Sequence, residues 1–512
     1  MNFELIIYGN WKNAIRFIIL NSSFIIFLSS CSFQKQIAKS AKENVLNNKA
    51  LQTAHVGISI FDPAENKYLY NYQGDKYFVP ASNTKIPTCY AAMKYLGDSL
   101  VGLRYNISKS KMSSDQLFLS IKPTGDPTLL HPDFLNHPVW QFLQKSAKDF
   151  GFNAAMMDTV WQTDHWGNGW SWNDYDASYM PERSAFPIYG NVIEIEINSL
   201  DNRKIYREAL INDYTSSDNF VGYPAHLFKT QNSFFDSLVN PRFFLMSEKN
   251  FNLINPYVSI KRTFLDNKFE VSEANSPFKK KSIPFITKGI QTAKDFIKDS
   301  LNIHLATIVS YDSKEGKKEF RTISGYFVHG AYLELDKWNT IHSQPTDSLL
   351  ESMMHRSDNF FAEQSLLMVS NERLGMMNDA KIIDTILKTD FKDLPQKPRW
   401  ADGSGLSRYN LFTPQDFVAI LNKMKNEFGM ERIKVIFPTG GEGTISSYYK
   451  ADSGYIYAKT GTLSGVVAFS GYLYTRKGKL LIFSALVNNH QASATDVRRA
   501  IEKFLQGIRN RY

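Results

Sequence analysis

The sequence contains little of the material from which metal sites and disulfide scaffolds are built. Only two of its 512 residues are cysteines, Cys31 and Cys89, and its ten histidines are scattered without an H-E-x-x-H motif. Two cysteines allow at most one disulfide, and no cluster of metal-ligand type is present, so we expect no metal and no cofactor. The chain also has no internal repeat, no low-complexity tract and no nucleic-acid-binding module, although its net charge is +9. Nucleic acid is therefore not an expected partner.

The sequence also lacks a long hydrophobic run. The apolar stretch over residues 17–28 follows Lys12 and Arg16, and it is too short and too interrupted for a transmembrane helix. A basic start followed by a short apolar run is typical of a secretory signal peptide. The stretch ends in Leu-Ser-Ser-Cys31, which resembles the bacterial lipobox, in which the cysteine becomes the lipidated first residue of the mature protein. We expect a lipoprotein-type signal over residues 1–31 and lipidation of Cys31, with a plain signal peptide as the alternative.

Three short motifs together indicate a serine nucleophile. In Ser82-Asn83-Thr84-Lys85, at the start of a predicted helix, the spacing puts Ser82 and Lys85 on one face. A hydroxyl is a weak nucleophile until a base takes its proton, and lysine can be that base only when its amine is neutral. An S-x-x-K match alone is common by chance. Here Ser357-Asp358-Asn359 and Lys459-Thr460-Gly461-Thr462 follow, in the order found in penicillin-interacting serine enzymes.

The two ends of the chain have matching patterns of strands and helices. Alternation of apolar and polar residues and turn signals predict strands over residues 54–61, 67–72, 455–460, 466–474 and 480–488, and helices over residues 86–96 and 495–508. Five strands and helices drawn from both ends indicate one α/β domain, of α+β type, whose sheet joins the two termini.

More than half of the chain separates Ser82 from Ser357, which is more than one compact domain needs. From about residue 105 to about 325 the pattern changes to short strands, aromatic clusters and proline-rich turns, with a strand predicted over residues 192–197 and a helix over 291–301. We interpret this region as one or two inserted, mostly β domains that hold no catalytic group. The expected division is a signal over residues 1–31, a first part of the catalytic domain over 32–104, the insertion over 105–325, and a second part over 326–512.

With these motifs the chain resembles the low-molecular-mass class C penicillin-binding proteins, the D-alanyl-D-alanine carboxypeptidase/endopeptidase family, from about His55 to about Arg509. Three further stretches are similar to family segments: Thr-Gly-Asp-Pro-Thr-Leu at 124–129, Gly-Trp-Ser-Trp-Asn-Asp at 169–174 and Asp-Gly-Ser-Gly-Leu-Ser-Arg at 402–408. The resemblance implies a penicillin-recognising serine-transferase fold, with an antiparallel sheet flanked by helices and domains inserted between the first two motifs. Pro87, inside the predicted helix, and a loose glycine turn at 437–444 depart from the family pattern.

The resemblance also implies a role for each motif residue. Ser82 attacks the carbonyl of the penultimate D-Ala, Lys85 is the general base, and Ser357 relays a proton to the leaving amine. Substrate binding falls to Asn359 for an amide, to Lys459 and Thr460 for the terminal carboxylate, and to Gly461 and Thr462 beside them, with the N–H groups of Ser82 and Thr462 as the oxyanion hole. Four other features are expected to be structural: Asp358 as a cap, Glu363 as a structural partner, residues 402–408 as a brace, and Trp161, Trp166, Trp170 and Trp172 as packing residues.

The expected function is therefore a serine-type D-Ala-D-Ala carboxypeptidase or endopeptidase acting on peptidoglycan stem peptides in the bacterial envelope. β-Lactams are the expected inhibitors, and a lipid anchor on a membrane is the expected attachment. A β-lactamase shares the motifs, although the long insertion argues against it. A non-catalytic lipoprotein that binds cell wall or β-lactam is the second alternative, although the intact motif residues argue against that. The sequence does not choose between carboxypeptidase and endopeptidase activity.

Overall fold

The computed structural model describes residues 33–109, 117–150, 153–197, 220–221, 228–229, 231, 246–247, 258–267, 269–273, 280–312, 318–324, 327–329 and 337–511. The predicted signal over residues 1–31, with Cys31, lies outside these residues. The chain divides into two compact units: unit 1 comprises residues 1–86, 393–400 and 410–512, and unit 2 comprises residues 87–392 and 401–409. The chain passes from unit 1 to unit 2 within helix α2 (Lys85–Tyr95).

Unit 1 is built on a five-stranded antiparallel sheet that joins the two ends of the chain. Its strands and helices are β1 (His55–Asp62), β2 (Lys67–Tyr72), the 3₁₀ turn η3 (Ala81–Thr84), α10 (Pro414–Ile436), β17 (Ile456–Leu463), β18 (Val466–Tyr474), β19 (Leu480–Asn488) and α11 (Ala494–Arg511). The strand order is β17-β18-β19-β1-β2, so the last three strands of the chain pair with the first two. This order confirms the predicted sheet joining both termini.

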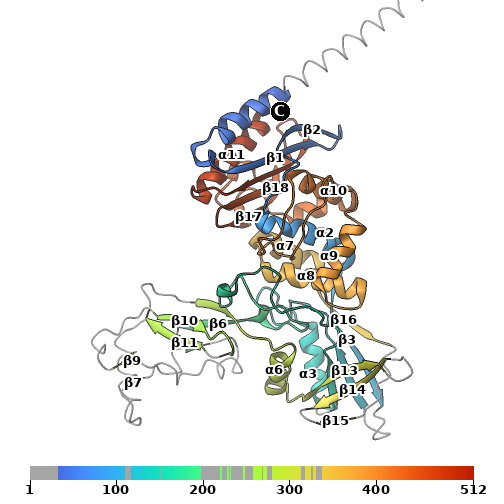
Figure 1. Cartoon of the computed structure of the whole chain (residues 1–512). Helices are drawn as coiled ribbons and strands as arrows, with labels where there is room; N and C mark the ends of the chain where they lie inside the picture. Colours follow the sequence, from blue (N-terminus) through green and yellow to red (C-terminus); the bar gives the residue numbers. More distant parts are fainter. Residues whose placement is uncertain are drawn as a thin grey trace, which may run out of the picture. The chain divides into compact units, whose positions relative to one another are not determined.

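Helices cover both faces of this sheet because side chains alternate between the faces along each strand. Val56, Ile58 and Ile60 of β1 point into a core formed with the apolar side of α11 and with the helical residues that begin at Phe33, which lie beside α11 in Figure 1. On the opposite face, Gly57 allows Phe78 and the first residue of α10 to approach, since a Cβ there would lie 2.5 Å from the Phe78 ring. The sheet is therefore buried on both sides.

Unit 2 contains a seven-stranded mixed sheet and several α-helices. The larger sheet has the order β15-β14-β13-β5-β4-β3-β16, in which β5 runs parallel to both of its neighbours. Its strands are β3 (Ser99–Lys109), β4 (Leu117–Lys122), β5 (Ala154–Met157), β13 (Leu305–Asp312), β14 (Lys318–Ser324), β15 (Phe327–His329) and β16 (Asn339–Pro345). The helices are α3 (Pro138–Phe150), α6 (Gln291–Leu301), α7 (Thr346–Arg356), α8 (Asn359–Leu374) and α9 (Asp379–Lys388).

Smaller sheets complete unit 2. Strands β6 (Val192–Ile197), β8 (Phe228–Lys229) and β12 (Lys280–Pro284) form one, β10 (Val258–Arg262) and β11 (Phe269–Glu273) another, and β7 (Phe220–Val221) and β9 (Met246–Ser247) a third. The mixture of helices with antiparallel and mixed sheets confirms the predicted fold class, including the strand over 192–197 and the helix over 291–301. The boundaries predicted for the insertion stay a prediction.

Two expectations about local structure are also resolved. Pro87 is the third residue of α2, so it falls in the first turn, where a helix tolerates a missing N–H. The side chain of Cys89, in the same helix, is fully buried. Among the described residues, none of the helices has the length and apolar character needed to cross a bilayer.

Candidate active site

Ser82 and Lys85 lie close together in unit 1 because the chain forms a 3₁₀ turn there rather than regular α-helix. In a 3₁₀ turn, residues i and i+3 lie one above the other, and Lys85 Nζ donates to Ser82 Oγ at 3.2 Å. The Lys85 side chain is fully buried. Ala81, the residue before Ser82, has φ of +47°. This backbone conformation destabilises a residue with a Cβ by about 1 kcal/mol. The tight turn therefore holds the hydroxyl against a buried amine.

Lys459 is a second buried cation in the same unit. It lies on β17 with no exposed surface, and its Nζ donates to the carbonyl of Thr460 at 2.7 Å. Burial, followed by the positive charges of Lys85 and Arg498, lowers the pKa of Lys459 well below its usual range. Two buried amines that repel each other in this way disfavour the state in which both are protonated.

The end of β17 approaches the Ser82 turn closely because residue 461 is glycine. A Cβ at Gly461 would lie 2.6 Å from the carbonyl oxygen of Pro80 and 3.0 Å from the backbone nitrogen of Ser82. Asn83 fixes the other side of the turn, since its Nδ2 donates to Ser470 Oγ of β18 at 2.7 Å. The Ser82 backbone N–H and strand β17 are thereby held side by side.

A substitution at this contact should slow acylation without unfolding the protein. In Gly461→Ala the new methyl group meets backbone atoms, so β17 must shift, and a displacement of this kind can cost about 10²-fold in rate. Labelling by fluorescent penicillin should slow accordingly. Gly507→Ala in α11 is the control outside the site, because its Cβ would meet only a side-chain atom, Ser40 Oγ, at 3.0 Å. Equal labelling rates in the two variants would contradict this assignment.

Two further residues beside the lysine motif escaped the sequence analysis. Thr460 Oγ1 donates to Thr444 Oγ1 at 2.7 Å, so the glycine turn at 437–444 supplies a side chain next to the motif. Arg498 of α11 donates to Thr462 Oγ1 at 2.6 Å. A guanidinium there adds positive charge beside residues expected to bind a carboxylate. Neither residue has a sequence pattern of its own, because both reach the site only through the fold.

The Ser357-Asp358-Asn359 motif lies in unit 2, at the junction of two helices. Ser357 ends α7 in the left-handed conformation, with φ of +61°. Asp358 is the N-cap of α8, and its Oδ1 accepts from the Phe361 N–H at 2.9 Å, as predicted for a capping residue. Asn359 is the first residue of α8. Because the two units are separate bodies, the meeting of this motif with Ser82 stays a prediction.

A short segment, residues 179–184, runs along α8 and fixes its side chains. Asn359 Nδ2 donates to the carbonyl of Tyr179 at 2.9 Å. Further along, Arg183 donates to Glu363 at 3.2 Å, and the Gln364 amide accepts from the Ser184 N–H and donates to the Ser184 carbonyl. In each of these contacts a residue of the segment meets the residue 180 positions later in α8. The position of Asn359 therefore depends on the whole segment.

At the centre of this contact is a buried charge cluster that no sequence motif predicts. Arg183, 1% exposed, donates to Glu363 and, at 2.6 Å, to Asp379, the first residue of α9. Glu363 also accepts from the Ser404 N–H at 2.7 Å, which ties α8 to the 402–408 stretch. Removing one partner would leave a buried charge uncompensated, which typically costs about 3–5 kcal/mol. Glu363 is therefore a structural partner, as expected.

The 402–408 stretch is a brace around one carboxylate, as the sequence predicted. Asp402, fully buried, accepts from the N–H groups of Gly405 at 2.8 Å and Ser407 at 2.7 Å, and from the Trp170 indole at 3.0 Å. Trp170 thus packs inside unit 2, whereas Trp172 is 68% exposed and packs at the surface, against Phe264.

Glu363 should make stability depend on pH. Burial and the nearby charge of Asp402 raise the pKa of Glu363 from an ordinary value of 4.5 to about 7, although the positive charge of Arg183 acts to lower it. Because the folded pKa lies above the unfolded one, this group's contribution to stability is complete below pH 4.5 and is lost as pH rises through about 7. The free energy of unfolding in urea, measured for wild type relative to Glu363→Gln, should decrease as pH rises from 4.5 to about 7. A constant difference across this range would contradict the raised pKa.

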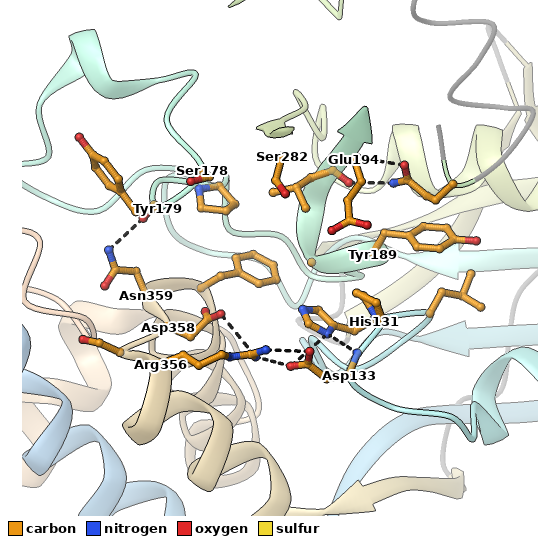
Figure 2. Close-up of a pocket in the computed structure, with 18 residues that line it drawn as sticks. His131, Asp133, Ser178, Tyr179, Tyr189, Glu194, Ser282, Arg356, Asp358 and Asn359 are labelled. Carbon is orange, nitrogen blue, oxygen red and sulfur yellow. Dashed lines mark hydrogen bonds and ion pairs between the residues drawn. The ribbon is translucent and has the colours of Figure 1, made fainter. Parts of the chain in front are cut away.

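A pocket of about 540 Å³ lies in unit 2 beside the Ser357-Asp358-Asn359 turn. In Figure 2, Asn359 points toward Tyr179 on one side of it, and Arg356 is paired with Asp133 below. The other lining residues include Leu130, His131, Ser178, Tyr189, Gly190, Glu194, Gln231 and Ser282. The volume is in the range of pockets that hold small molecules or part of a peptide. The motif therefore borders a space in which a substrate group could lie.

Within the residues that the structure describes, no group of three or more His, Cys, Asp or Glu side chains is arranged to hold a metal ion. In unit 1 the motif residues bring together a hydroxyl, two buried amines and backbone N–H groups, a set that suits nucleophilic acyl transfer.

Comparisons with known proteins agree with this chemistry. The sequence matches the D-Ala-D-Ala carboxypeptidase 3 (S13) family over residues 38–216 and 336–508. It is 23% identical to the D-alanyl-D-alanine carboxypeptidase DacB of Haemophilus influenzae, over 95% of this chain and 96% of that protein. It is 21% identical to the penicillin-sensitive carboxypeptidase A of Dictyostelium discoideum, over 87% of this chain and 85% of that protein.

The fold leads to the same group of proteins. The structure is similar to the crystal structure of penicillin binding protein 4 (dacB) from Haemophilus influenzae, with a TM-score of 0.62 and 19% identity, over 92% of this chain and 98% of that one. The same protein has also been crystallised in complex with a β-lactam. By sequence, by fold and by the order of its motifs, the chain is a penicillin-binding serine peptidase that belongs to the D-Ala-D-Ala carboxypeptidase 3 (S13) family.

Proposed function

We propose that the chain cleaves the D-Ala-D-Ala end of peptidoglycan stem peptides through an acyl-enzyme on Ser82. Ser82 Oγ attacks the carbonyl carbon of the penultimate D-Ala while its proton passes to the neutral amine of Lys85. The tetrahedral oxyanion lies between the backbone N–H groups of Ser82 and Thr462. As the C–N bond breaks, Ser357 passes the proton to the leaving D-Ala nitrogen, which leaves an ester on Ser82. Water then attacks the ester with the same groups acting in reverse.

The observation that carries this proposal is the contact of 3.2 Å between Lys85 Nζ and Ser82 Oγ, made by a lysine with no exposed surface. A lysine on the surface would be protonated at neutral pH and could not accept the hydroxyl proton. Here Lys85 is buried and has a second buried amine, Lys459, close enough for each to disfavour protonation of the other.

Substrate recognition is proposed to use the remaining motif residues. Lys459 and Thr460 bind the terminal carboxylate, with the guanidinium of Arg498 close to this end of β17. Asn359 holds an amide of the stem peptide, and the pocket beside it receives the part of the peptide that precedes the cleaved bond. This proposal requires Asn359 and Ser82 to act on the same substrate molecule.

Defined muropeptides test the reaction directly. Purified protein should release D-Ala from a monomeric pentapeptide substrate, with 1:1 formation of the tetrapeptide, and this release should be blocked by penicillin. A cross-linked dimer supplied in parallel reports endopeptidase activity, since its cleavage yields monomers without free D-Ala. A separate sample of the same preparation would be tested for penicillin binding. If that sample binds penicillin but the protein cleaves neither substrate, the proposal fails.

The predicted lipid anchor gives a further proposal, that the mature protein is attached to a membrane in the bacterial envelope through Cys31. Cys31→Ser should remain unprocessed or move to the soluble fraction, because a membrane-bound protein of this kind is held mainly by its acyl chains. Fractionation and intact mass measure this. Cys89→Ala, which changes the other cysteine, should fractionate as wild type. Identical processing of wild type and Cys31→Ser would contradict the anchor.

A further inference from the structure

Aromatic side chains surround Phe264 in unit 2, with Trp172 exposed and with Tyr175 and Trp166 partly buried. Trp172 is 68% exposed and meets the Phe264 ring edge to face, with centroids 6.1 Å apart, while Tyr175 and Trp166 approach the same ring at 5.1 and 5.7 Å. Phe264 is itself 40% exposed, and Leu265 beside it is 83% exposed. We call these five residues the aromatic ridge. A cluster of large exposed apolar groups, unlike single ones, marks a surface that binds something.

The ridge is held rigidly from below. Arg262 is 1% exposed and donates from Nε to the Pro284 carbonyl at 2.8 Å and from its guanidinium to the Tyr175 carbonyl at 3.1 Å. In return, the Tyr175 hydroxyl donates to the Arg262 carbonyl at 3.0 Å. These bonds fix the two segments that carry the ridge, so a ligand would meet ordered rings and lose little affinity to ordering them.

The same segment leads to the proposed substrate site. The carbonyl of Tyr179 accepts from Asn359, and Tyr179 lines the pocket beside that residue. Trp172 stands seven positions earlier, so the chain holds it within about 25 Å of this contact. A stem peptide bound at Asn359 carries its sugar strand at its other end, within reach of the surface around Trp172. The ridge is thus within about 25 Å of the place where a peptide attached to sugars would lie.

The chemistry of the ridge suits a pyranose ring. One face of a pyranose presents C–H groups, which carry slight positive charge and pack on the negative face of an aromatic ring. Hydroxyl and acetamido groups at the edge of the sugar need hydrogen-bond partners, and Ser171 and Asn173, both exposed, flank Trp172. Asp174 and Asp176 follow in the same segment and would repel an anionic membrane surface.

We infer that the aromatic ridge binds the glycan strand to which the stem peptide is attached, so that the protein prefers glycan-linked peptides over free ones. This inference rests on the proposed function, which supplies the peptide. Trp172 and Phe264 would then be specificity residues rather than catalytic ones, because they would contact sugars at a distance from the cleaved bond.

Two substrates that differ only in the sugar test this inference. Full-length wild type, Trp172→Ala, Phe264→Ala and Leu135→Ala would each be assayed on a free pentapeptide and on the same peptide attached to its disaccharide. Both ridge variants should lose roughly 3- to 10-fold in kcat/KM on the glycan-linked substrate and nothing on the free peptide. Leu135 is completely exposed and lies outside the ridge, so Leu135→Ala should match wild type on both substrates. Equal losses on both substrates, or no loss on the linked one, would overturn the inference.

A binding assay separates this inference from the peptidase proposal. Glycan strands stripped of their peptides should retain wild type and Leu135→Ala in a sedimentation assay, but not Trp172→Ala, whether or not any peptide is cleaved. Failure of wild type to sediment with stripped glycan overturns the inference, as does sedimentation with anionic vesicles instead. Penicillin labelling at the wild-type rate shows that Trp172→Ala is folded. If Trp172→Ala loses labelling, the sedimentation of Phe264→Ala with stripped glycan tests the inference in its place.

Discussion

Ser82→Ala should abolish both penicillin labelling and D-Ala release. Without Oγ there is no atom to form the ester, and neither Lys85 nor a backbone group can replace it. Labelling by fluorescent penicillin on a denaturing gel should fall below detection, and release of D-Ala should fall to the background rate. Ser453→Ala, at an exposed serine in unit 1, is the matched control and should behave as wild type. Undiminished labelling of Ser82→Ala would refute the nucleophile assignment.

Substitution of Lys85 should have the next largest effect. Lys85→Ala removes the base that accepts the Ser82 proton, and general-base assistance is typically worth roughly 10²- to 10⁴-fold in rate. Lys85→Arg is the sharper variant, since a guanidinium keeps the positive charge but cannot act as a base near neutral pH. The second-order rate constant of acylation by penicillin, measured from labelling reactions quenched at set times, should fall to a similar extent in both variants.

A lysine on the same helix provides the control for this experiment. Lys94 of α2 is 32% exposed and pairs with Asp390 at 2.6 Å. Lys94→Ala should acylate at the wild-type rate because its amine has no role at Ser82. If Lys85→Arg kept most of the activity, Lys85 would act through its charge rather than as a base.

Much of unit 1 could be predicted because its signals are local. The alternating strands over residues 67–72, 466–474 and 480–488 are found with the predicted bounds. The three-residue spacing of Ser82 and Lys85 predicted their contact, although it did not reveal that the turn is 3₁₀ or that Ala81 has a positive φ. These details depend on how closely Gly461 of β17 approaches, which is a property of the tertiary fold.

Residues that act through distant contacts could not be predicted. Arg183 meets Glu363, which lies 180 positions away, and no periodicity or motif connects them. Thr444 and Arg498 reach the lysine motif from other elements for the same reason. The exposure of Trp172 also depends on how the 172–175 turn packs against Arg262, so the sequence alone could not separate the buried tryptophans from the exposed one.

The β-lactamase alternative differs from the proposed function in the rate at which the penicillin ester is hydrolysed. After penicillin acylates a serine, the leaving nitrogen stays tethered and obstructs the approach of water, so a lactamase needs a dedicated base for deacylation. The only fully buried glutamate between the second and third motifs, among the residues described, is Glu363, and it is engaged by Arg183 and the Ser404 N–H. The penicillin ester should therefore persist.

The central claim, that Ser82 is the nucleophile of an acyl-enzyme, is tested most directly by locating the penicillin adduct. Purified wild-type protein would be mixed with penicillin, quenched in acid after seconds and after an hour, digested, and mapped by tandem mass spectrometry. We predict one adduct, with the mass of the intact drug, on Ser82 of the peptide containing Ser82-Asn83-Thr84-Lys85, present at both times. An adduct on another residue, or rapid turnover of penicillin with no adduct at either time, would contradict the account.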